Sequence, residues 1–351
     1  MSLQAQAVRE AFSALRGDAR VHHREIAERL GISEGELIAA HAGSADEPWA
    51  ILRVTRLRPL WAELVGALAV LGDVTARTAN AGCVHETMGV YQPASHLDCA
   101  RWGDSGTGWA HGFAITELGA QGERHNLQFF DRTGAAVHQI LLAPGCDLSA
   151  WEALVGRFAE ADQQPDMAVQ AGVATGTMAP DERIDVRGLR EAWRSLRDTH
   201  EFPALLRRFG VTRLQALRLA ERKFALPVEM TSAHHVLASA AVNRVPVRVL
   251  AGNAGLVQVH AGEIDKVTVQ GGWVRVQDAG FRLQLREDHR ASAWVVRRPT
   301  SRGLETSLEL FDPAGAAIAM IFGEHAPGRP EPCEWRMLID GVLKESAAHA
   351  A

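Results

Sequence analysis

Two stretches of the chain carry nearly the same sequence, and they decide the fold. The first is Leu127-Gln-Phe-Phe-Asp-Arg-Thr-Gly-Ala-Ala-Val137, and the second is Leu308-Glu-Leu-Phe-Asp-Pro-Ala-Gly-Ala-Ala-Ile318. They are offset by 308 − 127 = 181 residues, which is about half of the 351-residue chain. An offset this long indicates two copies of a whole domain, because solenoid repeats have periods of roughly 20 to 50 residues.

Two further pairs of similar segments occur in the same order in the two halves. Asn80-Ala-Gly-Cys-Val84 resembles Asn253-Ala-Gly-Leu-Val257. Nearer the start of each half, Ala27-Glu-Arg-Leu-Gly-Ile-Ser33 resembles Leu206-Arg-Arg-Phe-Gly-Val-Thr212. Three ordered matches are hard to produce by chance, so the sequence predicts an internal repeat.

The segment between the copies has the composition of a linker. Residues 163–180 are mostly small or polar and include two prolines, a pattern typical of connecting segments. We therefore expect a first repeat at 1–162, a linker at 163–185 and a second repeat at 186–351.

Each half begins with helical patterns and continues with strand patterns. In the second half, Asp185 is a plausible N-cap, Gly210 is placed to end a second helix and Thr212 is placed to cap a third. Short apolar or alternating runs then predict a mostly antiparallel meander. These runs are 247–250, 255–260, 273–277, 281–285, 292–297, 304–311 and 316–322. Helices segregated from an antiparallel sheet define the α+β class.

Composition excludes several classes of protein. Lys and Arg number 37 against 42 Asp and Glu, so the net charge is −5 and a polyanion such as nucleic acid is not the expected main partner. Four cysteines lie far apart without CxxC spacing, which argues against a disulfide framework or a zinc knuckle. The N-terminus lacks a secretory pattern and no apolar stretch is long enough to span a membrane. We expect a cytoplasmic protein without membrane insertion.

A helix-turn-helix regulator is one alternative function. Residues 26–37 combine a Gly in a turn, a Ser at the start of a second helix and apolar spacing on both sides. Glu34 and Glu36 would place negative charge against DNA phosphates, and the copy at 209–217 favours a packing element. We therefore favour the structural interpretation of this motif, with DNA binding as the weaker alternative.

Histidine pairs do not predict a metal site built from protein ligands alone. His22-His23 and His234-His235 are adjacent in sequence, and adjacent residues on a helix point about 100° apart. No HExxH motif or acidic metal-binding loop accompanies them.

The segment around His200 carries the strongest functional signal. His200 lies at a break between predicted helices, with apolar residues such as Trp193 and Phe202 nearby and Arg207, Arg208 and others following. An iron porphyrin needs an axial nitrogen ligand, apolar walls for its ring and cations for its propionates. A helix-terminal histidine is also often a surface residue stabilised by the helix dipole, so both interpretations stay open on these residues alone.

The motif Trp193-Arg-Ser-Leu-Arg-Asp-Thr-His200 resembles that of the bacterial haemin-transport and haemin-degrading factor family of the HemS/ChuS/HmuS type. The similarity continues through 210–220, 285–300 and 306–312, and more weakly through 84–91. It covers nearly the whole chain and is more specific in the second half. The family uses the histidine of this motif to bind haem iron.

The resemblance implies a site that binds haem b, iron protoporphyrin IX. It makes His200 the proximal ligand of the iron, with Arg213 and Arg298 at positions that hold the propionates. The second position is often Lys in the family, and Arg keeps the charge and adds a bidentate fork. His325 stands where the family commonly has a basic residue.

The resemblance does not place the ligand on the distal side of the haem. The family has a distal Arg on a strand of the first half, but Gly103–Gly108 reads as an insertion there. Arg101 and His111 are the candidates, and we expect one haem per chain.

The resemblance implies a haem-binding protein of a bacterial haem-uptake system that serves iron acquisition. Such a protein would traffic haem from an importer to a haem oxygenase. The alternative within the same site is a haem-degrading enzyme that opens the porphyrin itself and releases iron, with the haem supplying the redox chemistry. The helix-turn-helix regulator is the alternative from another class.

Overall fold

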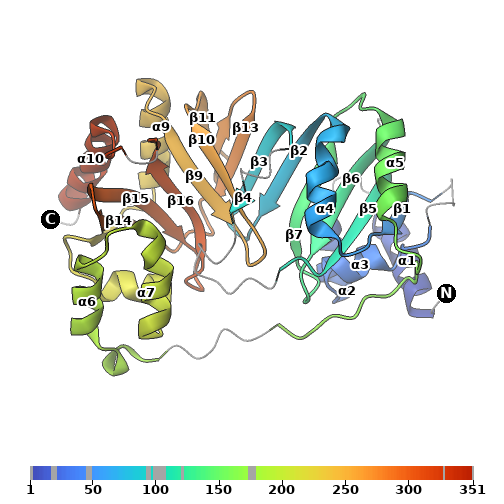
Figure 1. Cartoon of the computed structure of the whole chain (residues 1–351), viewed down its shortest axis with the longest axis horizontal. Coiled ribbons are helices and arrows are strands. Elements are labelled where there is room, and N and C mark those ends of the chain that lie inside the picture. Colours follow the sequence, from blue (N-terminus) through green and yellow to red (C-terminus); the bar gives the residue numbers. More distant parts are fainter. Residues whose placement is uncertain are drawn as a thin grey trace. The chain divides into compact units, whose positions relative to one another are not determined.

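The computed structural model describes residues 3–16, 22–44, 50–91, 96–97, 108–119, 122–172, 179–326 and 329–349. These residues form helices and antiparallel strands (Figure 1), which confirms the α+β class. The chain divides into two compact units. Unit 1 comprises Met1–Arg77, Met88–Ala94 and Thr107–Val173, and unit 2 comprises Thr78–Thr87, Ser95–Gly106 and Ala174–Ala351.

Unit 1 is a sheet with helices on both faces. Its strands follow the order β1-β5-β6-β7-β2. Phe113 and Ile115 of β5 pack with α1, α2 and α3, whereas Ala114 joins the core beneath α4 and α5, as the alternation of side chains along a strand requires. The elements wholly or partly in unit 1 are α1 (Leu3–Leu15), α2 (His23–Leu30), α3 (Glu34–Ala39), β1 (Leu52–Arg56), α4 (Trp61–Ala67), η1 (Leu68–Leu71), β2 (Asp73–Ala79), β5 (His111–Gly119), β6 (Gly122–Phe130), β7 (Ala136–Leu142) and α5 (Leu148–Phe158).

Unit 2 has the same layers and an additional set of strands. One sheet follows the order β4-β10-β9-β16-β15-β14-β8, and strands β3, β13, β12 and β11 are consecutive neighbours in another. Val296 and Phe311 pack against α6, α7 and α8, whereas Val295 and Leu308 face α9 and α10. The elements wholly or partly in unit 2 are β3 (Cys83–Val90), β4 (His96–Leu97), η4 (Asp181–Arg183), α6 (Val186–Arg194), η5 (Thr199–Glu201), α7 (Phe202–Phe209), α8 (Arg213–Leu219), β8 (Ala225–Val228), α9 (Ser232–Asn243), β9 (Val247–Gly252), β10 (Val257–Gly262), β11 (Lys266–Gln270), β12 (Trp273–Gln277), β13 (Phe281–Arg286), β14 (Ser292–Thr300), β15 (Gly303–Phe311), β16 (Ala317–Gly323) and α10 (Cys333–His349).

The strand orders confirm the predicted internal repeat. The order β1-β5-β6-β7-β2 in unit 1 matches β8-β14-β15-β16-β9 in unit 2. The repeated stretches 127–137 and 308–318 form equivalent hairpins, and each contains a register shift, at Phe129/Phe130 and at Leu310/Phe311. After the strand, Asp131 and Asp312 each accept a hydrogen bond from the backbone N–H four residues later.

The predicted helix ends of the second half are confirmed. Asp185 Oδ1 accepts from the backbone N–H of Gly188 at 2.8 Å and begins α6. Gly210 ends α7 with a φ of +61°, a left-handed conformation that Gly adopts without a Cβ clash. Thr212 caps α8 by accepting from the backbone N–H of Gln215.

The helix-turn-helix pattern forms two helices that pack inside unit 1. Gly31 ends α2 in the left-handed conformation, and Ser33 and Glu36 form a capping box at the start of α3. Leu37 and Ile38 of α3 are fully buried with strands β1 and β5. The would-be recognition helix is therefore a six-residue packing element.

None of the described helices is long and apolar enough to cross a membrane.

Candidate functional site

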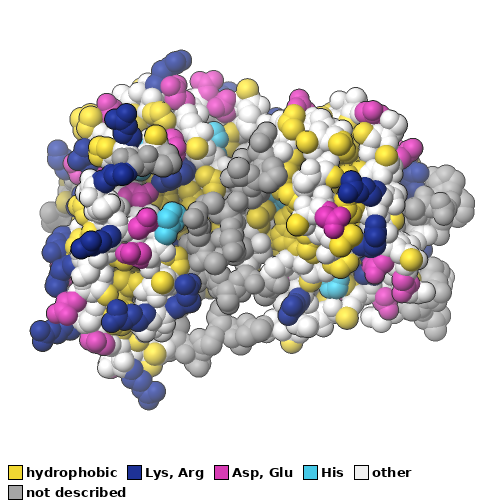
Figure 2. Space-filling view, viewed as in Figure 1, with side chains coloured by type: hydrophobic (Ala, Val, Ile, Leu, Met, Phe, Trp, Pro, Cys, Tyr) yellow, Lys and Arg dark blue, Asp and Glu magenta, His cyan; other side chains and the backbone are white. Residues whose placement is uncertain are grey.

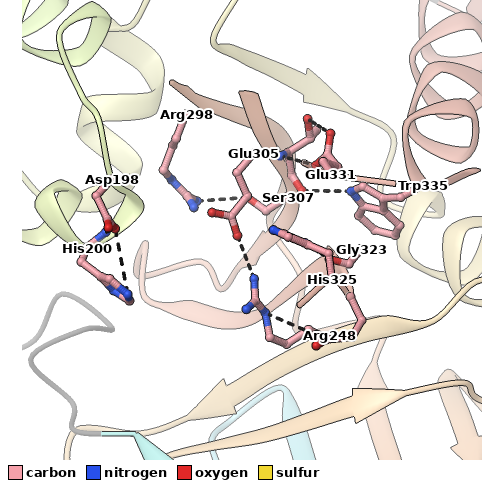
Figure 3. Close-up of polar contacts among 12 residues, drawn as sticks. Asp198, His200, Arg248, Arg298, Glu305, Ser307, Gly323, His325, Glu331 and Trp335 are labelled. Atoms are coloured by element: carbon pink, nitrogen blue, oxygen red, sulfur yellow. Dashed lines mark hydrogen bonds and ion pairs between the residues drawn. The ribbon is translucent and has the colours of Figure 1, made fainter. Parts of the chain in front are cut away.

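His200 lies on an exposed turn of unit 2. The turn is the 3-10 helix η5, and Asp198 caps it by accepting a hydrogen bond from the backbone N–H of His200 at 2.8 Å. The His200 side chain is 61% exposed, and its Nε2 lies 3.9 Å from Asp198 Oδ1 (Figure 3). An exposed imidazole on a capped turn is available to an external ligand.

The turn that carries His200 is anchored to the hairpin of β14 and β15. Trp193 Nε1 donates to the Arg297 carbonyl at 3.1 Å, and the backbone N–H of Ser301 donates to the Arg197 carbonyl at 2.8 Å. Phe202, two residues after His200, is 1% exposed. Its ring packs edge to face against that of Trp193, with the ring centres 4.7 Å apart. These contacts fix the backbone of the turn while its histidine faces outward.

Arg213 and Arg298, the two predicted propionate ligands, share one buried carboxylate. Arg213 Nε and Nη2 donate to Glu309 Oε2 and Oε1 at 2.7 and 3.1 Å. Arg298 Nη2 donates to Glu309 Oε1 and, at 3.0 Å, to Ser307 Oγ. Both guanidinium carbons lie 5.1 Å from the centre of the Phe202 ring. The structure thus brings both arginines beside the segment that carries His200.

The group of Arg213, Arg298 and Glu309 keeps a surplus positive charge. Two guanidiniums oppose one carboxylate, whose side chain is 0% exposed. Burial alone would raise the pKa of Glu309, but the two guanidiniums outweigh burial and lower the pKa to about 2. Arg213 Nη1 and Arg298 Nε are buried without a hydrogen-bond partner among the described residues. Unpartnered donors with surplus positive charge are suited to an incoming anion.

The alternation of side chains explains why charges occupy these strands. Leu308 and Leu310 of β15 point to the core beneath α9 and α10, so Ser307 and Glu309 point to the opposite face. On β14, Arg298 shares that face with Val296, which packs against α6 to α8. Sequence reasoning missed Glu309, although a glutamate between two buried leucines was a readable signal.

Some of the arginines that follow His200 in the sequence are exposed, and others are buried. Arg207 and Arg208 of α7 are exposed, and Figure 2 shows Lys and Arg side chains over the part of unit 2 that contains α6 and α7. Arg213 begins α8, and its side chain is only 9% exposed.

His325 lies two residues beyond the end of β16. Its Nδ1 lies 3.2 Å from the Gly323 carbonyl, and because a carbonyl only accepts, Nδ1 carries the proton. The more prominent cation here is Arg248 of β9, which donates to Glu305 Oε1 at 2.8 Å (Figure 3). Sequence reasoning did not single out Arg248.

The structure describes one of the two distal candidates. His111 begins β5 in unit 1, where it lies opposite Phe130, and burial followed by the charge of Arg56 lowers its pKa. Arg101 lies outside the described residues.

The described part of the chain contains no group of three or more His, Cys, Asp or Glu side chains that could hold a metal ion.

Known proteins with similar sequences and structures match this chain over most of its length. The sequence model of the haemin-degrading HemS.ChuX domain matches residues 210–342, and that of the haem utilisation proteins ChuX/HutX matches 55–154. The hemin transport protein HemS of Yersinia enterocolitica is 34% identical over 330 residues, covering 89% of this chain and 90% of HemS. The chain belongs to the HemS family.

Two solved structures share the fold of this HemS-family chain. The structure of holo-PhuS, a haem-binding protein from Pseudomonas aeruginosa, is 35% identical with a TM-score of 0.88, and the match covers 96% of this chain and 99% of PhuS. The haem-degrading enzyme ChuS of Escherichia coli O157:H7 is 28% identical with a TM-score of 0.84, over 96% of this chain and 99% of ChuS. The family predicted from the motif ending at His200 is confirmed.

Proposed function

We propose that this chain binds one haem b and carries it within a bacterial haem-uptake pathway in the cytoplasm. His200 would supply the axial nitrogen to the iron, and Arg213 and Arg298 would receive the propionates. The observation that carries the proposal is the exposed imidazole of His200, two residues before Phe202, whose ring lies against two arginines that share a single carboxylate. The haem-binding relatives HemS and PhuS support it.

The residues present fit a haem group. The unpartnered nitrogens of Arg213 and Arg298 offer hydrogen bonds that no described residue accepts, and propionates are the carboxylates of haem that such donors would bind. When bound, the haem would supply its iron for redox chemistry. The chain's part is to hold the axial ligand and the propionates.

A haemin titration of the full chain tests this proposal. The wild type is expected to give a Soret band, and His200→Ala is expected to weaken or shift it because the axial nitrogen is lost. His235→Ala is the matched control, since His235 is also exposed and lies on α9 of the same unit. An unchanged spectrum in His200→Ala would overturn the role of His200.

Haem degradation is the second candidate activity, supported by the relation to ChuS. The reaction needs an external reductant and oxygen or peroxide, so the complex should be incubated with ascorbate under air, with and without catalase. A ring-opened product formed with catalase present would favour a degrading enzyme. Retention of the Soret band without such a product would favour a carrier that receives haem from an importer and delivers it to a separate oxygenase.

A further inference from the structure

Arg298 and Glu305 lie directly opposite each other on β14 and β15. Opposite charges in this cross-strand position normally stabilise each other by pairing. Here each side chain has another hydrogen-bond partner. Arg298 Nη2 donates to Glu309 and Ser307. Glu305 accepts instead from Arg248 Nη2 at 2.8 Å.

Arg248 reaches Glu305 from β9, across an intervening strand. β16 lies between β9 and β15, and Phe322 of β16 is the cross-strand partner of Arg248. The Arg248 guanidinium lies 5.2 Å from the centre of the Phe322 ring, and that of Arg298 lies 5.5 Å from the same ring. One aromatic ring therefore supports both arginines, and Figure 3 shows Glu305 between them.

The binding of Glu305 to Arg248 determines the charge around Arg298. With Glu305 held by Arg248, the inner group has two guanidiniums against the single carboxylate of Glu309. The charge of Glu305 already acts on Arg298, but its hydrogen bond goes to Arg248. If Glu305 turned to Arg298, it would pair with that guanidinium directly, and two carboxylates would then contact the two inner guanidiniums. Arg248 also lies 3.8 Å from Glu324.

We propose that Arg248 is a positioning residue that withholds Glu305 from Arg298 and thereby keeps the inner arginines available to the carboxylates of a ligand. This inference rests on the proposed haem-binding function and adds a residue to it. Arg248 need not touch the ligand. Its side chain is 31% exposed, against 3% for Arg298, which makes it the accessible residue of this pair.

The test compares haemin affinity in wild type, Arg248→Ala and Arg248→Ala with Glu305→Gln. Arg248→Ala should weaken haemin binding about tenfold, equivalent to about 1.4 kcal/mol, because Glu305 becomes free to neutralise Arg298. Adding Glu305→Gln removes the competing charge and should restore affinity to within about twofold of wild type. Arg248→Lys keeps the charge and should retain most of the affinity. Circular dichroism should show that each variant is folded.

Haemin dimethyl ester provides the second arm, because its propionates carry no charge. The ester should bind wild type and Arg248→Ala with equal affinity. Unchanged haemin affinity in Arg248→Ala, failure of Glu305→Gln to restore it, or an equal loss with the ester would overturn the role of Arg248. Absence of any wild-type haemin complex would instead overturn the proposed function, so the two failures are distinguishable.

Discussion

Asn80 and Asn253 each donate a side-chain hydrogen bond to the backbone carbonyl that precedes the other. Asn80 Nδ2 reaches the Gly252 carbonyl at 2.8 Å, and Asn253 Nδ2 reaches the Ala79 carbonyl at 3.1 Å. The two asparagines come from equivalent positions of the repeated sequence. Duplication has therefore produced a reciprocal contact within unit 2.

This reciprocity predicts a stability effect. Asn80→Ala and Asn253→Ala should each lower the free energy of unfolding by about 1–2 kcal/mol, because a partly buried carbonyl loses its donor. In the double variant, the loss of unfolding free energy should be smaller than the sum of the two single losses, since the two hydrogen bonds share one contact region. Urea denaturation measures these values. Asn243→Ala, at an exposed helix end, is the control, and equal effects at all three positions would contradict the prediction.

Glu309→Gln should be strongly destabilising. The neutral amide leaves Arg213 and Arg298 buried without their counter-charge, a change that costs about 3–5 kcal/mol of unfolding free energy. Glu263→Gln, at an exposed carboxylate 3.9 Å from Arg244, should change it by less than about 0.5 kcal/mol. Chemical denaturation compares the two, and similar midpoints would show that Glu309 does not hold the arginines together.

His23 predicts acid sensitivity of unit 1. Burial, followed by the charges of Arg16 and neighbouring histidines, lowers the pKa of His23 from 6.5 to about 3. The unfolded chain therefore takes up the proton first, so the stability contributed by neutral His23 is present above pH 6.5 and is lost as pH falls toward 3. His23→Phe, which copies Phe202 at the equivalent position of the second repeat, should flatten this dependence. Urea denaturation midpoints from pH 4 to 7 measure this pH dependence. The same dependence of the midpoint on pH in wild type and His23→Phe would show that His23 is not its source.

Gly323 predicts a steric requirement at the end of β16. A Cβ placed there would lie 2.5 Å from Cγ of Trp335, whose buried indole donates to the Thr306 carbonyl. Gly323→Ala should lower the free energy of unfolding by about 1–3 kcal/mol, because the packed ring must shift. Gly341→Ala, in α10 with open space around its Cα, should be neutral or stabilising by up to about 1 kcal/mol. Thermal denaturation that ranks the two variants the other way would contradict this packing.

The sequence predicted the parts of the fold that depend on local patterns and on duplication. The hairpin at 308–318 and the caps at Asp185 and Thr212 have short-range signals, and the structure confirms them. Helices α9 and α10 were not predicted. α9 has an apolar run without a strong polar face, and its role as a cover for the sheet arises from packing against distant strands.

The sequence and its family resemblance named three residues of the candidate site, but not the interactions between them. His200, Arg213 and Arg298 were named from the sequence, and the structure places them around Phe202. Their sharing of Glu309 depends on tertiary packing, because Arg213 of α8 contacts a carboxylate of β15 that lies 96 positions later in the chain. No local sequence pattern predicts such a contact.

The imidazole of His200 is the proposed iron ligand, and chemical rescue provides a direct test of this role. Haemin bound to His200→Gly should give absorption and electron paramagnetic resonance spectra that differ from those of the wild-type complex, because the axial nitrogen is missing. Added imidazole should then move both spectra toward the wild-type form. A His200→Gly complex with wild-type spectra before any imidazole is added would contradict this role.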